Sequence, residues 1–197
     1  MNVTTICVYC ASSERIDPRY FELATQVGTE IARRGYGLVS GGGSVSCMGA
    51  VARAVRAGGG RTTGVIPQAI VDMEVADGAA DELVVTRDLR ERKGEMERRS
   101  DGFLALPGGL GTLDEIFEIW VSRSLGMHHK PLVVLDPDGV FAMMRAQVDD
   151  LVLRGFARPA VRDAIQWATG VSEALDLLEA EPARMVPTAG EVLESEP

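Results

Sequence analysis

The chain of 197 residues is predicted to form a single α/β domain, with an open parallel sheet covered by helices on both faces. Three observations predict this fold. Short apolar segments alternate with longer amphipathic segments along nearly the whole chain. Two of the apolar segments, Cys7–Tyr9 and Leu132–Leu135, are continuous, which is typical of strands buried on both sides. Many of the segments end in turns that contain glycine or proline.

The expected strands and helices follow one another in nearly strict alternation. Val3–Tyr9 is expected to be a strand because it ends in a continuous apolar run. Pro18–Arg34 is expected to be a helix because its apolar residues recur every three or four positions and Gly35 follows it. By the same criteria the further strands are Tyr36–Ser40, Thr62–Ile66, Glu82–Thr86, Phe103–Leu106, Pro131–Leu135 and Ile165–Ala168. The further helices are Met48–Ala57, Leu89–Arg99, Thr112–Leu125, Val140–Arg154 and Val171–Glu179.

Strands that are joined by helices imply right-handed crossovers and parallel pairing. No internal repeat and no domain boundary is visible, so residues 1–180 are expected to form one domain. Residues 181–197 are rich in Glu and Pro and have no periodicity, which predicts a flexible acidic tail.

Composition excludes several classes of partner. The net charge is −9, and an acidic chain is a poor general binder of nucleic acid, whose phosphates attract Lys and Arg. No apolar run approaches the roughly 20 residues that span a bilayer, and the N-terminus has no basic region of the kind that begins a signal peptide. The three cysteines are too few and too scattered for a disulfide framework. We therefore expect a cytoplasmic protein with no membrane contact.

Three turns made of small residues follow predicted strands. They are Cys10–Ser13, Gly41–Ser44 and Pro107–Thr112. In an open parallel sheet the ligand binds beyond the carboxyl ends of the strands, and small side chains let it approach the backbone. Each turn alone is a weak signal, because glycines often do no more than form a tight turn. Three such turns at one edge of the sheet indicate a ligand site.

The segment Thr112–Glu115 has two interpretations that spacing alone does not separate. Its sequence, TLDE, matches a capping box, in which Thr112 and Glu115 cap their own helix. Alternatively, Glu115 is catalytic, since it lies on one helical face with Glu118 and beside Asp114, next to a glycine-rich turn. A carboxylate in that position could stabilise an oxocarbenium-like centre or orient water at a glycosidic bond.

Arg92 and Lys93 lie near the start of the helix Leu89–Arg99, close to the expected ligand edge. They are either part of a solvated helix face or hold a phosphate. Cys10 is expected to be a packed turn residue rather than a nucleophile. His128 and His129 are adjacent, so they cannot share a helical face as metal ligands would, and we expect no metal site.

The 20 basic residues include only two lysines, Lys93 and Lys130. Pyridoxal phosphate enzymes bind their cofactor through a Schiff-base lysine. Neither lysine lies in an isolated apolar segment, so the sequence disfavours a decarboxylase of that kind.

The nine residues Pro107–Glu115, with the sequence PGGLGTLDE, resemble the PGGxGTxxE signature of the LOG (LONELY GUY) family of cytokinin-activating phosphoribohydrolases. Further segments resemble the family in the same order along the chain: Val8–Ser13, Leu38–Gly43, Gly64–Pro67, Glu91–Met96, Leu125-Gly126 and His129–Pro131. The resemblance spans about Ile6 to Leu178. It implies a Rossmann-like fold, a homodimer, and no cofactor or metal.

The resemblance also implies a reaction and its residues. The reaction is hydrolysis of the N-glycosidic bond of cytokinin riboside 5′-monophosphates, and of AMP, to free base and ribose 5-phosphate. The matching catalytic pair is Arg92 and Glu115. The residues expected to bind substrate are Ser12, Gly42, Gly43, Met48, Glu74, Lys93, Gly108, Gly109, Gly111, Thr112, Leu113, Asp114 and Glu118. The alternative is a nucleotide-binding or carrier module on the same fold without turnover.

The chain departs from the family pattern at a few positions. Ala11 stands where glycine is usual, and Ser46-Cys47 replaces a common Gly-Leu. Asp77 and Arg90 each stand where histidine is common. These departures leave Arg92 and Glu115 intact, so they concern the shape of the pocket more than the reaction.

Overall fold

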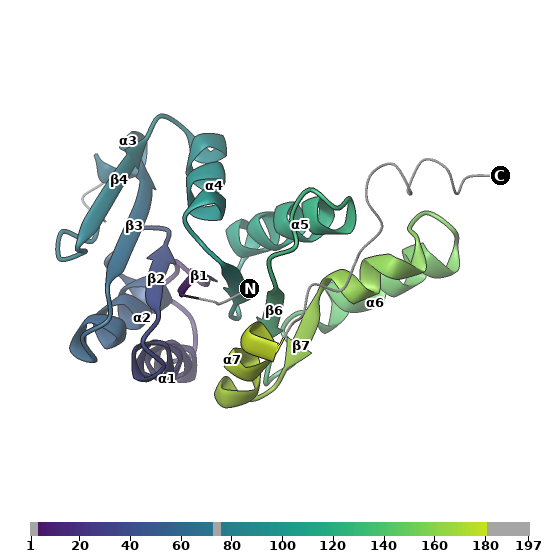
Figure 1. Ribbon diagram of the computed structural model, residues 1–197, viewed down its shortest axis with the longest axis horizontal. Coiled ribbons are helices and arrows are strands. Elements are labelled where there is room, and N and C mark those ends of the chain that lie inside the picture. The colour runs from purple at the N-terminus through teal and green to yellow at the C-terminus, as the bar shows by residue number, and fades with distance from the viewer. Residues whose placement is uncertain (1–3, 73–75, 181–197) are drawn as a thin grey trace.

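The computed structural model describes residues 4–72 and 76–180, which form a parallel sheet of seven strands in the order β4-β3-β2-β1-β5-β6-β7 (Figure 1). The strands are β1 (Thr5–Tyr9), β2 (Gly37–Ser40), β3 (Thr62–Pro67), β4 (Glu82–Thr86), β5 (Gly102–Ala105), β6 (Leu132–Leu135) and β7 (Gln166–Ala168). The helices are α1 (Arg19–Arg33), α2 (Ser46–Ala57), α3 (Gln68–Val71), α4 (Leu89–Arg98), α5 (Leu110–Ser124), α6 (Ala142–Leu153) and α7 (Val171–Ala180). A 3₁₀ helix covers Pro159–Ala164. The predicted parallel sheet with helices on both faces is confirmed.

The order of the strands creates a switch point at the centre of the sheet. The chain runs outward from β1 to β4, then returns to place β5 on the other side of β1. Cys7 of β1 is accordingly paired with Val39 of β2 and with Phe103 of β5. The connections that leave β1 and β5 lead to helices on opposite faces, which opens a crevice at the carboxyl ends of these strands.

Side chains that alternate along the strands divide the core into two layers. Ile6 and Val8 face a cluster that includes residues of α1, α2 and α7. Cys7 and Tyr9 face the opposite cluster, which includes residues of α4, α5 and α6. In Figure 1 the helices α1, α2 and α7 lie below the sheet, and α4 and α5 lie above it. Both faces of the central strands are therefore buried, as their continuous apolar sequences predict.

Most predicted boundaries agree with the structure to within one or two residues. Two short elements, α3 and the 3₁₀ helix Pro159–Ala164, were not predicted, because four to six residues are too few to display a helical period. The predicted acidic tail, residues 181–197, lies outside the described residues. Within the described part of the chain, none of the helices has the length and apolar character needed to cross a bilayer.

The adjacent histidines occupy different environments. His128 is buried and packs against the ring of Phe103, whereas His129 is exposed. The backbone N–H of Lys130 donates to Nδ1 of His128, and Nε2 lies 3.1 Å from the hydroxyl oxygen of Ser122. Burial lowers the pKa of His128 to about 4. In residues 4–72 and 76–180, no three His, Cys, Asp or Glu side chains gather in a group that could hold a metal ion.

Burial of neutral His128 predicts that the fold weakens in mild acid. The pKa is about 4 in the folded chain and near 6.5 when unfolded, so the unfolded chain binds an extra proton between these values. The contribution of His128 is complete above about pH 6.5 and declines as the pH falls toward 4. Between pH 7 and pH 5 it should lower the free energy of unfolding by up to about 2 kcal/mol.

Urea unfolding at pH 7 and pH 5 measures this effect. The wild type and His129→Gln should lose the same stability between the two pH values, and His128→Gln should lose less. Equal losses in all three proteins would show that His128 does not cause the pH dependence.

Candidate active site

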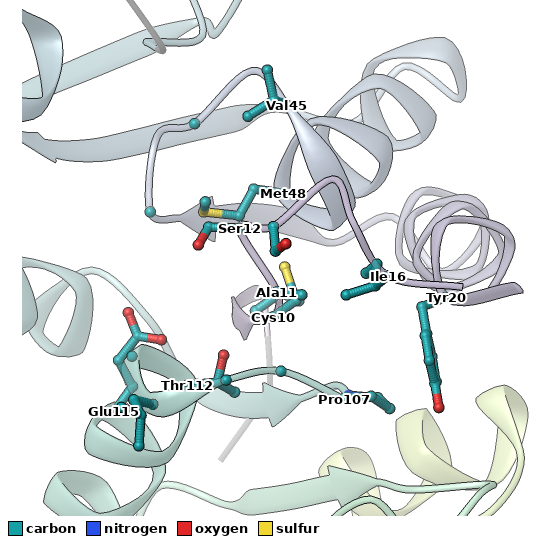
Figure 2. A pocket seen from close by; sticks show the side chains of 18 of the residues that line it. Cys10, Ala11, Ser12, Ile16, Tyr20, Val45, Met48, Pro107, Thr112 and Glu115 are labelled. Atoms are coloured by element: carbon teal, nitrogen blue, oxygen red, sulfur yellow. The ribbon is translucent and has the colours of Figure 1, made fainter. Parts of the chain in front are cut away.

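A cavity of about 690 Å³ opens at the carboxyl ends of β1, β2 and β5, where the three turns of small residues meet (Figure 2). Its volume lies within the range of roughly 300–1,000 Å³ that is typical of small-molecule sites. The lining comes from Cys10–Ser13 after β1, Gly41, Gly43 and Val45 after β2, and Pro107–Thr112 after β5. The predicted convergence of these turns at one edge of the sheet is therefore confirmed.

An ion pair between α4 and α5 forms part of the wall of the cavity. Nη1 of Arg92 donates to Oε1 of Glu115 at 2.8 Å, and Nε of Arg92 donates to the carbonyl oxygen of Val65 at 3.1 Å. The two side chains are only 13% and 8% exposed. The third nitrogen of the guanidinium, Nη2, has no partner among the described residues. Two of the three guanidinium nitrogens thus hold Arg92 in place in the wall.

Gly41 makes room for this guanidinium at the end of β2. A Cβ atom on Gly41 would lie 2.1 Å from Nη2 of Arg92 and 3.2 Å from its Cζ. Since Arg92 is also held by Glu115 and Val65, a side chain at position 41 would displace it. The first glycine of the turn after β2 thus has a steric role in placing Arg92.

The charge on Glu115 is opposed by burial and supported by Arg92. Burial raises the pKa of Glu115 above its usual value, and the neighbouring Arg92 acts in the opposite direction. A carboxylate this buried is costly unless it is paired and hydrogen-bonded. Loss of Arg92 would consequently favour the neutral form of Glu115.

The capping interpretation of Thr112 and Glu115 is wrong. Helix α5 begins at Leu110 with Gly109 as its N-cap, two residues before the predicted start, and no side chain caps it. Glu115 is a full turn inside the helix, and its carboxylate binds Arg92 instead. Backbone N–H groups in the first turn of a helix lack partners within that helix, and here they border the cavity, which suits an anionic group.

The turn before α5 admits no side chain at its first glycine. A Cβ atom on Gly108 would lie 2.2 Å from Oγ1 of Thr112, which is buried and stiff as a β-branched residue. Gly109 and Gly111 have open space around the equivalent position. Gly108 is therefore required by packing, whereas Gly109 and Gly111 leave the backbone accessible.

The structure brings most predicted site residues to the cavity. Those that line it are Ser12, Gly43, Met48, Arg92, Gly108, Gly109, Gly111, Thr112 and Glu115. Gly42 does not line the cavity. It lies in the turn after β2, where its φ angle of 73° is a left-handed value that suits glycine. Glu74 lies outside the described residues.

The four remaining predicted residues lie beside the cavity rather than in its lining. Lys93 binds Asp114, at an Nζ–Oδ2 distance of 3.0 Å, and also Glu118. This second ion cluster joins α4 to α5 in parallel with the pair Arg92–Glu115. Leu113 is half-buried and packs against the core beneath α5.

Several residues that line the cavity were not predicted. Outside the three predicted turns they are Val8, Ile16, Tyr20, Val45, Ile70 and Val140. Ile16 and Tyr20 could have been found from their place just after the first turn. Val140 could not, because it follows β6, which ends in no glycine-rich ligand turn.

The positions that depart from the family pattern have distinct surroundings. Ala11 lines the cavity and is buried. Asp77 binds Arg56 at 2.8 Å, and its backbone N–H donates to the carbonyl oxygen of Gly42 at 2.8 Å, which fastens the turn after β2. Arg90 is exposed on α4 and does not line the cavity.

Comparison with known proteins identifies close relatives. Residues 48–178 match the family model described as "Possible lysine decarboxylase". The chain is 50% identical over 171 residues to a Mycobacterium tuberculosis protein named cytokinin riboside 5′-monophosphate phosphoribohydrolase, covering 87% of this chain and 91% of that protein. An Arabidopsis thaliana protein of the same activity name is 41% identical over 174 residues, covering 88% of this chain and 80% of its own length.

Solved structures share the fold at lower identity. A molybdenum cofactor binding protein from Rippkaea orientalis superimposes with a TM-score of 0.70 and 23% identity, covering 91% of this chain and 98% of the other. The molybdenum cofactor carrier protein of Chlamydomonas reinhardtii gives a TM-score of 0.68 and 23% identity, covering 90% and 99%. At this identity the likeness concerns the Rossmann-like fold alone.

The description "lysine decarboxylase" does not fit the lysines of this chain. Pyridoxal phosphate would need a lysine at the cavity for its Schiff base. Lys93 binds Asp114 and Glu118, and Nζ of Lys130 donates to the carbonyl oxygen of Glu97 at 2.6 Å. Neither lysine lines the cavity.

Proposed function

The chain belongs to the LOG family of cytokinin riboside 5′-monophosphate phosphoribohydrolases, and from that premise we propose that it hydrolyses the N-glycosidic bond of nucleoside 5′-monophosphates. The products are the free base and ribose 5-phosphate. Cytokinin riboside 5′-monophosphates, the substrates in the names of its relatives, are the first candidates, and AMP is the second.

The observation that carries this proposal is the buried ion pair Arg92–Glu115 in the wall of the cavity. A module that only binds an anionic nucleotide gains nothing from a desolvated carboxylate beside it. A hydrolase does, because cleavage of a glycosidic bond develops positive charge on the ribose. The carboxylate of Glu115 is fixed in advance to stabilise that charge.

We assign the substrate phosphate to the turn Gly108–Thr112. The backbone N–H groups there lie at the positive end of the α5 dipole, and Gly109 and Gly111 leave them accessible. Figure 2 shows Thr112 between Glu115 and Pro107 along one side of the cavity. A phosphate near Thr112 would bring the ribose of the same nucleotide close to Glu115.

The bond between C1′ of the ribose and the base nitrogen breaks with its electron pair moving to the base, which takes up a proton. Water attacks C1′ and loses a proton, so the ribose gains a hydroxyl group. Glu115 stabilises the cationic ribose and orients the water. Arg92 offers Nη2 to the substrate and stabilises the negative charge that develops on the departing base.

Incubation of the purified protein with AMP and with N6-isopentenyl AMP tests the proposal directly. Release of free base together with ribose 5-phosphate supports it. Binding of either nucleotide without release of base would favour the alternative, a nucleotide-binding or carrier module.

The three cysteines are free thiols, which suits the reducing cytoplasm in which we propose that the enzyme works.

Glu115→Gln should abolish most of the activity while the protein still folds. Glutamine keeps an oxygen that accepts the hydrogen bond from Arg92 but has no charge for the cationic transition state. Electrostatic contributions of this kind are worth about 3 kcal/mol, so kcat should fall about 10²-fold or more. Steady-state kinetics with AMP measures kcat, and urea unfolding verifies the fold. Turnover at the wild-type rate would refute the catalytic role of Glu115.

Arg92→Lys should also fail, although it keeps the positive charge. The guanidinium reaches Val65, Glu115 and the cavity through three nitrogens, and a single ammonium cannot replace that fork. We expect kcat/KM to fall roughly 10²-fold, which corresponds to about 2.7 kcal/mol. Lys93→Arg is the matched control, since Lys93 itself binds exposed carboxylates outside the cavity and such pairs contribute about 0–1 kcal/mol. Equal, small losses in both variants would remove Arg92 from the reaction.

We also propose a homodimer that forms through the outer face of α5. Ile116 and Trp120 are buried against the sheet, while Phe117, whose ring stacks on that of Trp120, and Val121 are 40% and 51% exposed. These two residues form an apolar stripe with Leu110, which borders the cavity. A second copy on this stripe would cover apolar area next to the site.

Light scattering at micromolar concentration should give about twice the chain mass of 21.1 kDa, and Val121→Glu should reduce it to the mass of one chain. A wild-type particle of 21.1 kDa would contradict the dimer. A dimer that survives Val121→Glu would place the interface elsewhere.

A further inference from the structure

The first two residues of α2 direct their side chains away from their own helix. The hydroxyl of Ser46 donates a hydrogen bond to the carbonyl oxygen of Ser13, at an Oγ–O distance of 2.6 Å. The thiol of Cys47 donates to the carbonyl oxygen of Tyr20, at an Sγ–O distance of 3.4 Å. Both side chains are buried. The start of α2 is thereby tied at two points, to Ser13 in the connection between β1 and α1 and to Tyr20 in the first turn of α1.

The backbone of Ser46 is unusual as well. Its φ angle is +54°, a left-handed value that within residues 4–72 and 76–180 no other non-glycine residue adopts. A Cβ atom makes this conformation costly. Serine at the start of a helix often caps the first N–H groups, yet α2 has no side-chain cap. The hydroxyl is instead used in the bond to Ser13.

The two tied segments are separate walls of the cavity. Ser13 lines it from the β1–α1 connection and Tyr20 from the first turn of α1. Val45 and Met48 line it from the start of α2, and Figure 2 shows them on the other side of the cavity from Tyr20. The bodies of α1 and α2 pack so closely that a Cβ atom on Gly28 would lie 2.4 Å from the carbonyl oxygen of Val51. The loop residues 12–15 are exposed and lack such packing.

Building on the proposed function, we propose that Ser46 and Cys47 form a clasp that fixes the width of the cavity and so determines which nucleoside 5′-monophosphates it accepts. Neither residue lines the cavity, so both are positioning residues rather than catalytic ones. A wall that is fixed before binding does not have to be ordered by the substrate, which improves affinity. A fixed width also discriminates between bases that differ in size.

The thiol of Cys47 is suited to this role because it remains a donor. Burial raises its pKa above the usual value, so it stays protonated at neutral pH. A thiol is a weak donor, however, and Ser46 is expected to supply the larger part of the effect.

Two substitutions of Ser46 separate the clasp from backbone stability. Ser46→Ala and Ser46→Gly both remove the hydroxyl, but glycine adopts a positive φ without strain. Both should therefore raise KM for AMP about fivefold with kcat within about twofold, although Ser46→Gly should be the more stable of the two in urea. Both should also bring the kcat/KM values for AMP and N6-isopentenyl AMP closer together. Cys47→Ala should act in the same direction and less strongly.

Thr29→Ala is the matched control, since Thr29 also donates its hydroxyl to a backbone carbonyl, that of Thr25, but on the exposed face of α1. It should leave KM unchanged. A normal KM in both Ser46 variants would overturn the clasp. So would a KM that rises only in Ser46→Ala, because the effect would then follow backbone stability rather than the lost hydrogen bond.

Hydrogen exchange measures the clasp without relying on turnover. Backbone amides of residues 12–20 should exchange faster in Ser46→Ala and in Ser46→Gly than in the wild type, and unchanged exchange in both would overturn the proposal. If the wild type hydrolyses neither nucleotide, the proposed function fails. The clasp is then decided by this exchange and by the Kd for AMP, which should rise in both variants.

Discussion

The ion pair Arg92–Glu115 connects helices that follow strands from different parts of the sheet. Helix α4 follows the edge strand β4, and α5 follows β5 beside the central strand. Two charges removed from water remain ionised only if they stay together with good geometry. The relative position of α4 and α5 is thus fixed by electrostatics as well as by the apolar contacts beneath them. The cavity keeps its charged wall only while that position holds.

Sheet topology explains why this pair faces a cavity rather than the core. The reversal of strand order between β1 and β5 opens a crevice at their carboxyl ends. The turns that border the crevice contain glycine where a side chain would collide. At Gly41 the collision would be with the guanidinium of Arg92, and at Gly108 with Thr112. The same glycines that narrow the turns therefore leave room for Arg92 and Thr112 in the wall of the cavity.

Much of the fold followed from the sequence, because alternation of short apolar and longer amphipathic segments leaves few arrangements for a chain of this size. The meeting of the three turns followed as well, since parallel strands bring their carboxyl ends to one edge. The partner of Glu115 could not be predicted from the sequence. Local spacing favoured a cap at Thr112 as strongly as catalysis, and only the placement of α4 and α5 on the same face of the sheet shows that Arg92, 23 residues away, takes the carboxylate. Val140 was missed for a similar reason, since its place at the cavity depends on the whole sheet.

Arg92 and Lys93 are consecutive residues of α4, but the carboxylates that they bind differ in burial. Arg92 meets one carboxylate that is 8% exposed, and Lys93 meets two, Asp114 and Glu118, that are 61% and 41% exposed. In a screened surface environment a charge can be exchanged with little effect on a neighbouring reaction. In the desolvated pair, loss of the charge on Arg92 would favour the neutral form of Glu115 and change the electric field in the cavity. The second cluster joins the same two helices on the solvent side, whereas the buried pair sets the charge of the cavity wall.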